Sequence, residues 1–251
     1  MTARRFALYG GVGIAIYLAT LIATIPAPWA SRAVERISGH KLQLREPTGS
    51  LWSGGGRLYA NQRSGPQLEL GELRWRTAWA GIFRGKLVTD VAFGNASRAM
   101  HVELSLSGVT VQGLDIALPA RVLANFAPGL DTVGPQGTLR IRSDSLRLDA
   151  DSILGLAEIE WRQVRLTRAP GLDLGSHIAR LRGGGSKVDI ELATLEGPLR
   201  LTGKGTWDRQ SGLTLAGAAE HGAQAGAELA QFLRVMCPEY RNNRCGFRLR
   251  L

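Results

Sequence analysis

The chain has 251 residues, of which 44% are hydrophobic and 21% charged, and its formal net charge is +10. This length and composition exclude a disordered tail, because the chain carries enough apolar side chains to bury a sizeable core. The basic residues are mostly arginines spread singly along the chain, without a basic run or a ribonucleoprotein-type aromatic motif, so the charge does not indicate nucleic acid as a partner.

A membrane anchor is the first predicted element. Residues 6–25 form an uncharged run, and about 20 apolar residues are what an α-helix needs to cross a hydrocarbon core of roughly 30 Å. We therefore expect a single transmembrane helix over residues 6–28. A cleaved signal peptide is the alternative, but such peptides have an apolar core of only about 7–15 residues. Prolines also crowd the nearest small-residue cleavage site, at residues 24–27.

The basic residues Arg4 and Arg5 set the orientation of this helix. By the positive-inside rule, the short tail of residues 1–5 stays in the cytoplasm, and a long following domain is translocated largely regardless of its charge. In a bacterium, the chain is therefore expected in the inner (cytoplasmic) membrane as a single-pass protein. Its bulk, residues 41–251, is expected to form a periplasmic β domain.

Small residues recur at every fourth position along the predicted anchor, at Gly11, Ala15, Ala19 and Ala23. They form one ridge on the helix, and such a ridge lets a second helix approach closely. The pattern predicts packing against another membrane component. The alternative is chance, because glycine and alanine are abundant throughout the chain.

A juxtamembrane segment, residues 29–40, links the anchor to the rest of the chain. Val34 and Ile37 are spaced as on a helix that lies along the membrane surface and ends by Gly39. From Lys41 the pattern changes to an alternation of apolar and polar residues, which is typical of antiparallel strands with one covered face. The clearest alternations lie at residues 41–45, 68–70, 102–106, 138–142, 158–162, 187–192 and 247–251.

Glycine-bearing breaks separate the alternating runs and predict hairpin turns or loops. They lie at residues 54–56, 64–66, 94–97, 128–137, 170–171, 183–186 and 210–212. Several runs change parity without a turn, for example at residues 141–146 and 161–164, which predicts β-bulges. Because bulges bend and twist a sheet, we expect long, curved strands.

Two later segments are typical of short helices. Residues 119–126 begin with a proline, which suits a first helical turn, and residues 223–236 carry apolar side chains at three- and four-residue spacings. With so few helices, the sheet must bury most of its apolar face against itself. The predicted fold is mainly β: a transmembrane helix, then a curved, largely antiparallel sheet with two short helices. The sheet is expected as a folded-over groove, a sandwich or a barrel.

Cys237 and Cys245, the two cysteines of the chain, lie close together near its end. In an oxidising compartment, two neighbouring thiols favour a disulfide. A metal pair is not expected, because a closed zinc site requires further ligands and no histidine is near these cysteines in the sequence.

No motif predicts catalysis. The four histidines are scattered without a metal-ligand spacing, and residues 49–54 lack the frame of a nucleophile elbow. The acidic pairs Asp149/Asp151 and Glu158/Glu160 have the spacing of a solvent-facing strand, and the tryptophans are expected to pack in the core and between strands. We therefore expect no enzyme, no cofactor and no metal.

Several segments, taken in order, resemble the type II secretion system protein N family. They are Gly-Ser-Leu-Trp-Ser-Gly-Gly-Gly-Arg-Leu at 49–58, Leu-Glu-Leu-Gly-Glu-Leu-Arg-Trp-Arg at 68–76, Phe-Arg-Gly-Lys-Leu at 83–87, the proline-led helix at 119, Gln-Gly-Thr-Leu at 136–139, Glu160-Trp161, and Gly-Pro-Leu-Arg-Leu-Thr-Gly-Lys-Gly at 197–205. The resemblance covers essentially the full length and keeps the order of the segments.

This resemblance implies a non-enzymatic inner-membrane component that supports the export of folded periplasmic proteins across the outer membrane. Its implied partners are other inner-membrane and periplasmic secretion proteins, bound through the anchor and through an exposed strand edge or basic face. The strand pattern also looks like that of AsmA and TamB related envelope proteins, whose curved sheets form apolar grooves. That likeness keeps a second function open, the binding or movement of lipid in such a groove.

Overall fold

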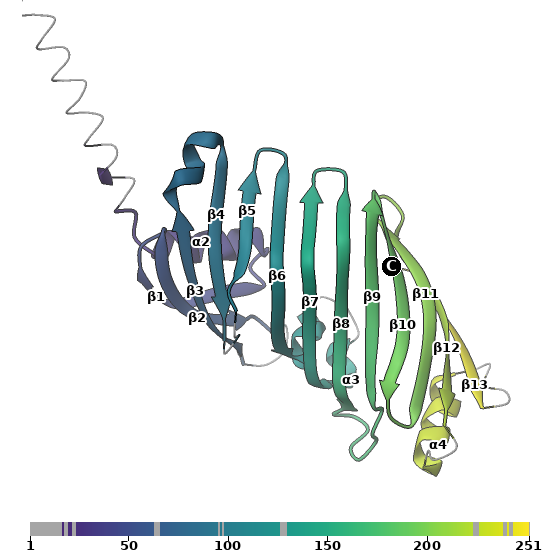
Figure 1. The fold of residues 1–251 in the computed structure, drawn as a ribbon. Helices are drawn as coiled ribbons and strands as arrows, with labels where there is room; N and C mark the ends of the chain where they lie inside the picture. Colours follow the sequence, from purple (N-terminus) through teal and green to yellow (C-terminus); the bar gives the residue numbers. More distant parts are fainter. Residues whose placement is uncertain are drawn as a thin grey trace, which may run out of the picture.

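One antiparallel β-sheet dominates the protein. The computed structural model describes residues 17, 20–21, 24–62, 66–94, 96, 98–125, 130–222, 226–237, 240 and 243–250. In this part of the chain, 13 strands form a single sheet in which each strand pairs with its neighbours in sequence (Figure 1). The expectation of a mainly β, antiparallel fold is therefore confirmed, and a single curved sheet takes the place of a two-sheet sandwich.

The strands run as a continuous meander from β1 to β13. They are β1 (Leu42–Gly49), β2 (Ser53–Ala60), β3 (Leu68–Ala78), β4 (Lys86–Phe93), β5 (Met100–Ser105), β6 (Gly108–Pro119), β7 (Pro135–Asp149), β8 (Ile153–Leu166), β9 (Ser176–Gly185), β10 (Lys187–Glu196), β11 (Leu199–Asp208), β12 (Gly212–His221) and β13 (Arg244–Arg250).

Short helical elements sit between the strands. They are the α-helices α2 (Pro28–Ile37), α3 (Leu130–Val133) and α4 (Ala227–Met236), and the 3-10 helices η1 (Trp79–Arg84) and η2 (Ala120–Asn125). The helices expected within residues 29–40 and at residues 119–126 and 223–236 correspond to α2, η2 and α4. The sequence pattern did not predict η1 or α3.

The sheet has one apolar and one polar face, because residues directly opposite each other on neighbouring strands share a face. On the apolar face, Leu139 of β7 lies opposite Trp161 of β8. On the polar face of the same two strands, Arg140 lies opposite Glu160 and Arg142 opposite Glu158. The alternation predicted from the sequence thus separates a core-facing side from a charged side.

The first half of the sheet curls around η2. Ala120 and Val122 of η2 pack in one cluster with Ala60 of β2 and Leu139 of β7. These two strands are five positions apart in the sheet, so they would lie about 24 Å from each other if the sheet were flat. A single short helix can contact both strands only because the sheet is strongly curved.

The second half of the sheet curls in the same way around α4. Leu229 and Leu233 of α4 pack in one cluster with Val164 of β8, Leu199 of β11 and Cys245 of β13. Trp161 of β8 packs against this cluster and also against the cluster around η2. The two halves of the core therefore meet at one tryptophan.

Both predicted bulges are confirmed. The register of β7 against β8 shifts between Arg142 and Leu146, and Gln163 of β8 has a positive φ of 51°. The turn predicted at residues 54–56 is wrong, because these glycines lie inside β2. A Cβ at Gly54 would collide with the Trp75 ring of β3, so glycine here lets the indole lie across the strand.

The predicted anchor lies almost entirely outside the described residues. The same is true of its four small-residue positions, Gly11, Ala15, Ala19 and Ala23. Within the ranges given above, no helix combines the length and the apolar character that a membrane crossing requires.

His177 of β9 provides a pH-dependent test of the core. Its ring is 5% exposed, and Nδ1 lies 3.2 Å from the Thr194 hydroxyl. Burial lowers the pKa of His177 below its ordinary value of 6.5. As the pH falls below 6.5, the unfolded chain therefore takes up a proton before the folded chain does, and stability is lost.

We expect His177→Gln to flatten the loss of unfolding free energy between pH 7 and pH 5, whatever its effect on stability at pH 7. Urea titrations at several pH values measure this slope, and His40→Asn, at an exposed histidine, serves as the control. An unchanged slope in His177→Gln would contradict the assignment.

Candidate interaction surfaces

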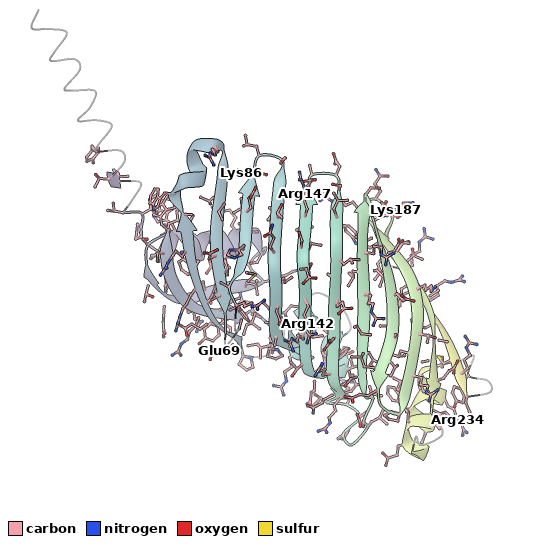
Figure 2. The ribbon with its side chains drawn as sticks, in the orientation of Figure 1. Glu69, Lys86, Arg142, Arg147, Lys187 and Arg234 are labelled. Atoms are coloured by element: carbon pink, nitrogen blue, oxygen red, sulfur yellow. A yellow bond between two sulfur atoms is a disulfide. The ribbon has the colours of Figure 1, made fainter. Side chains whose placement is uncertain are left out.

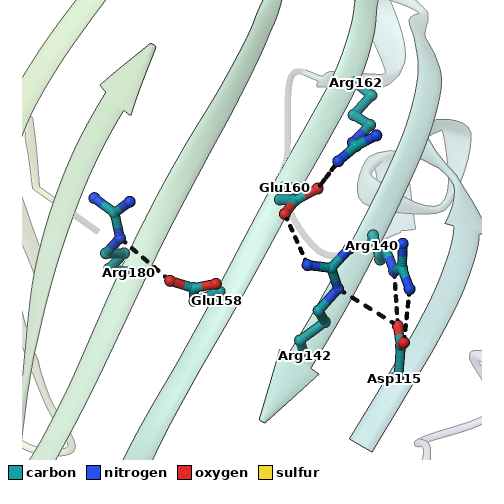
Figure 3. A network of polar contacts seen from close by, with 7 residues as sticks. All are labelled: Asp115, Arg140, Arg142, Glu158, Glu160, Arg162 and Arg180. Atoms are coloured by element: carbon teal, nitrogen blue, oxygen red, sulfur yellow. Dashed lines mark hydrogen bonds and ion pairs between the residues drawn. The ribbon is translucent and has the colours of Figure 1, made fainter. Parts of the chain in front are cut away.

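A network of ion pairs crosses the polar face of the sheet (Figure 3). At its centre is the carboxylate of Glu160 on β8, whose side chain is only 8% exposed. Arg142 Nη1 lies 3.2 Å from one carboxylate oxygen, and Arg162 Nη2 lies 2.7 Å from the other. Because the register sets these side chains on one face of β7 and β8, the arginines neutralise a carboxylate that would otherwise be buried alone.

The network continues from β7 to β6. Arg140 donates two hydrogen bonds to Asp115, of 2.8 and 2.7 Å, in a bidentate pair. The hydrogen bonds from Arg140 hold the pKa of the Asp115 carboxyl below its ordinary range. Arg142 Nε lies 3.8 Å from the same carboxylate, which joins the two ion-pair groups into one network across three strands.

Beside this network, β5 and β6 stop pairing, and we call the unpaired region along residues 113–119 of β6 the seam. β5 pairs with β6 only as far as His101 and Gln112, whereas β6 pairs with β7 along its whole length to Pro119. Gly113, where the pairing ends, has a φ of +66°, a conformation that glycine adopts readily. In the part of the chain that the structure describes, residues 113–119 of β6 therefore have a neighbouring strand on one side only.

A cleft of about 950 Å³ occupies the seam. Phe93 and Arg98 line it from the β4–β5 side, and Leu114, Asp115 and Arg140 line it from the β6–β7 side. The arginines of the network are already paired with carboxylates, so the cleft offers little free charge to an anion. Its unpaired strand edge and mixed polar and apolar lining suit an extended peptide better than a small charged ligand.

Catalytic chemistry finds no support in the described residues. Histidine, cysteine and carboxylate side chains in that part of the chain form no group of three that could hold a metal ion. The histidines lie on separate strands or connections: His101 lies beside Asp90, His177 beside Thr194, and His221 beside the Gly222 carbonyl.

Replacing Glu160 with alanine is expected to lower the free energy of unfolding by about 2 kcal/mol, because Arg142 and Arg162 lose their shared partner. The loss is kept below that of a fully buried pair by the partial exposure of both arginines. The control is Glu158→Ala, on the same strand and face, where the pair with Arg180 is exposed. It should cost less than about 1 kcal/mol. Equal effects in urea unfolding would contradict the central role of Glu160.

The chain enters the sheet through a fixed junction. The Leu51 amide donates to the Ile25 carbonyl at 2.9 Å, and the Ala27 amide donates to the Gly49 carbonyl at 3.3 Å. Ala27 is fully buried and packs with Leu44 and Trp75. Residues 25–27 are therefore bound to the turn between β1 and β2 rather than joined to the sheet by a loose linker.

The junction marks one rim of the sheet. The rings of Trp52, in the β1–β2 turn, and Trp79, in η1, lie 4.1 Å apart, so this turn adjoins η1. Lys86, Arg147 and Lys187 lie along the same rim, whereas Arg142 and Arg234 lie toward the opposite one (Figure 2). These five basic residues are thus divided between the two rims (Figure 2).

At the far end of the sheet, a disulfide joins Cys237, after α4, to Cys245 of β13, with a Cα–Cα distance of 6.0 Å. Both cysteines belong to the core cluster around α4. The bond fixes β13 to the helix that the second half of the sheet surrounds.

Replacing both cysteines with serine is expected to cost about 2–3 kcal/mol of unfolding free energy, because a closed loop of this length restricts the unfolded chain. The intact protein should also gain the mass of two hydrogens on reduction. A mass that does not change on reduction would show that the thiols are free.

The sequence pattern located some of these features and missed others. The two cysteines and the packing role of Trp75 and Trp161 were expected. Glu160 was expected to face solvent, and this was wrong, because Arg142 and Arg162 enclose it. The signal that could have revealed the network is that Arg140 and Arg142 on one predicted strand match the spacing of Glu158 and Glu160 on the next.

A single curled antiparallel sheet with a seam beside β6 defines the class of this chain, a mainly β protein. Residues 40–246 match the family described as Type II secretion system (T2SS), protein N, and the chain belongs to this family. The match covers the whole sheet up to β13 and confirms the resemblance seen in the sequence. The family is one of secretion-system components and not a known enzyme family. No curated protein and no solved structure matches the chain significantly.

Proposed function

We propose that the protein is a non-enzymatic accessory subunit of the type II secretion system, which binds other components during the export of folded periplasmic proteins across the outer membrane. The observation that carries this proposal is the family match over residues 40–246. The seam and its unpaired strand edge support it, because both offer binding surfaces without catalytic groups.

The proposal places residues 6–28 across the inner membrane, residues 1–5 in the cytoplasm and residues 41–251 in the periplasm. The fixed junction at residues 25–27 supports this arrangement, because a helix ending there would hold the sheet in a defined orientation. The rim that carries Trp52 and Trp79 would then lie nearest to the membrane surface. Trp29 in α2, 57% exposed, suits the same interface.

In this arrangement the ridge of Gly11, Ala15, Ala19 and Ala23 packs against the anchor of another single-pass secretion component. Exchange of residues 6–25 for an unrelated transmembrane helix tests the ridge. Export should fall although the chain is still made and inserted. Undiminished export would show that the anchor supplies location alone.

Crosslinking in cells that carry the secretion genes tests the subunit role. A photoreactive residue in place of Arg98, at the mouth of the seam, should yield an adduct with a secretion component. The same residue in place of Arg234, on α4 beside the far end of the sheet and outside the seam, is the control. The absence of any secretion component from both adduct sets would count against the proposal.

A second candidate function is the binding of lipid on the apolar face. The observation that favours it is that two leucines of this face, Leu104 of β5 and Leu249 of β13, remain 41% and 48% exposed. They lie outside the clusters around η2 and α4, so acyl chains could cover them. Mass spectrometry of the detergent-extracted protein separates the two candidates. Stoichiometric phospholipid would favour lipid binding, and its absence would favour the subunit role alone.

A further inference from the structure

The two terminal strands of the sheet differ in how their outer edges are treated. An exposed strand edge presents unpaired N–H and C=O groups and can recruit another strand, so proteins usually cover or interrupt such edges. β1 ends the sheet on one side and β13 on the other. In Figure 1 they lie at opposite ends of the curled sheet.

Several structural features together block the outer edge of β1. Ser31 and Ser38, at the start and just after the end of α2, reach the strand: Ser31 Oγ donates to the Leu44 carbonyl at 2.7 Å, and the Leu42 amide donates to Ser38 Oγ at 3.1 Å. Farther along, Glu46 has a positive φ and Pro47 has no amide hydrogen. Side chains and a bulge thus take the place of a neighbouring strand.

Among the described residues, the edge of β13 carries none of these features. Its seven residues contain no proline, and its register against β12 is regular from Arg244 to Arg250. Within the part of the chain that the structure describes, β12 is the only strand that pairs with it. The disulfide at Cys245 fixes one end of β13 to α4. The edge is therefore regular, anchored and open.

The side chains of β13 define what could pair with it. On the polar face, Arg248 and Arg250 are exposed and lie opposite Ala216 and Thr214. Among the described residues, neither arginine has an ion-pair partner, whereas Arg244 pairs with Glu220 at 3.2 Å. On the apolar face, Phe247 is half-buried and Leu249 is 48% exposed.

We infer that β13 accepts an extended segment of a partner protein as a fourteenth strand, and that this segment alternates acidic residues with apolar ones. The acidic side chains would pair with Arg248 and Arg250 across the strands, and the apolar ones would cover Leu249. A second copy of the chain is a poor occupant, because pairing β13 with β13 would bring arginines together on one face. This inference rests on the subunit role proposed above and assigns that role a binding surface.

The probe is an eight-residue synthetic peptide that alternates glutamate and valine, with a fluorophore at one end. We expect saturable binding to the full chain by fluorescence anisotropy, weakened by salt. The variant Arg248→Glu/Arg250→Glu should bind at least tenfold more weakly. The control Arg165→Glu/Arg168→Glu changes the net charge equally at exposed arginines outside β13 and should bind like the parent chain.

A version of the peptide with an N-methyl group on every residue tests strand addition itself, because it keeps the side chains but has no amide hydrogen to donate through either edge. It should not bind detectably. Equal binding of the methylated peptide would overturn the inference, as would equal loss in both arginine variants or concentration-dependent dimerisation through β13.

Export assays with the same variants keep this inference separate from the subunit role. If the chain is needed for export but the peptide does not bind β13, the inference fails and the subunit role stands. If the peptide binds as expected but deletion of the chain leaves export unchanged, the binding edge stands and the subunit role fails.

Discussion

Replacing Trp161 with alanine is expected to lower the free energy of unfolding by about 3–5 kcal/mol. Trp161 packs against the cluster around η2 and against the cluster around α4. Its indole Nε1 also donates to the Gln136 carbonyl at 3.0 Å. Truncation leaves a cavity where the two halves of the core meet and leaves the carbonyl without its donor.

Urea unfolding followed by far-UV circular dichroism measures this loss. Trp79→Ala is the control, because Trp79 is 42% exposed and its ring lies 4.1 Å from the ring of Trp52. It should cost about 1 kcal/mol, the value of a partly exposed aromatic pair. If the two substitutions cost the same, Trp161 does not link the two clusters in the way described.

The second large effect is expected at Gly175, just before β9. Its φ is +84°, and a Cβ at this position would collide with the backbone of Glu196 and Gly197 in the neighbouring turn. Gly175→Ala should therefore cost about 3 kcal/mol or more, since backbone cannot move aside as a flexible side chain can. The displaced connection also carries Leu172 and Leu174, which pack around α4.

A substitution at Gly171, in the same connection between β8 and β9, separates the cost of the steric collision from the cost of the left-handed backbone conformation. Its φ is +88°, but a Cβ there would meet nothing within 4 Å. Gly171→Ala should cost only about 1–2 kcal/mol, the penalty of a left-handed conformation for a residue with a side chain. A loss at Gly175 no larger than the loss at Gly171 would contradict the close approach of the two turns.

The fold was predictable where local pattern decides structure. Alternation of apolar and polar residues identified strands such as β5, β8 and β10, and parity changes located the bulges near Arg142 and Gln163. The sequence pattern gave wrong predictions where contacts between strands determine the local structure. Gly54 belongs to a strand rather than a turn because Trp75 of the next strand lies against it.

The bulges predicted that the sheet is curved, but they did not predict which shape the curved sheet takes. The sandwich, the barrel and the folded-over sheet share one alternation pattern, and the choice among them depends on which distant strands meet. Here η2 brings β2 and β7 into one cluster, and neither strand carries a local signal for that contact.

The candidate surfaces were the least predictable part. The burial of Glu160 depends on the register between β7 and β8, which the sequence suggests but does not determine. The seam at Gly113 depends on where β5 stops pairing with β6. The contrast between the edges of β1 and β13 needs the strand order as well as the serines of α2.

The subunit role is tested most directly by export itself. In a strain that secretes a type II substrate, deletion of the gene should reduce the substrate in the medium and cause a matching accumulation in the periplasm. Expression of the full chain should restore export. Unchanged export after deletion, with the other secretion components present at normal levels, would contradict the proposal.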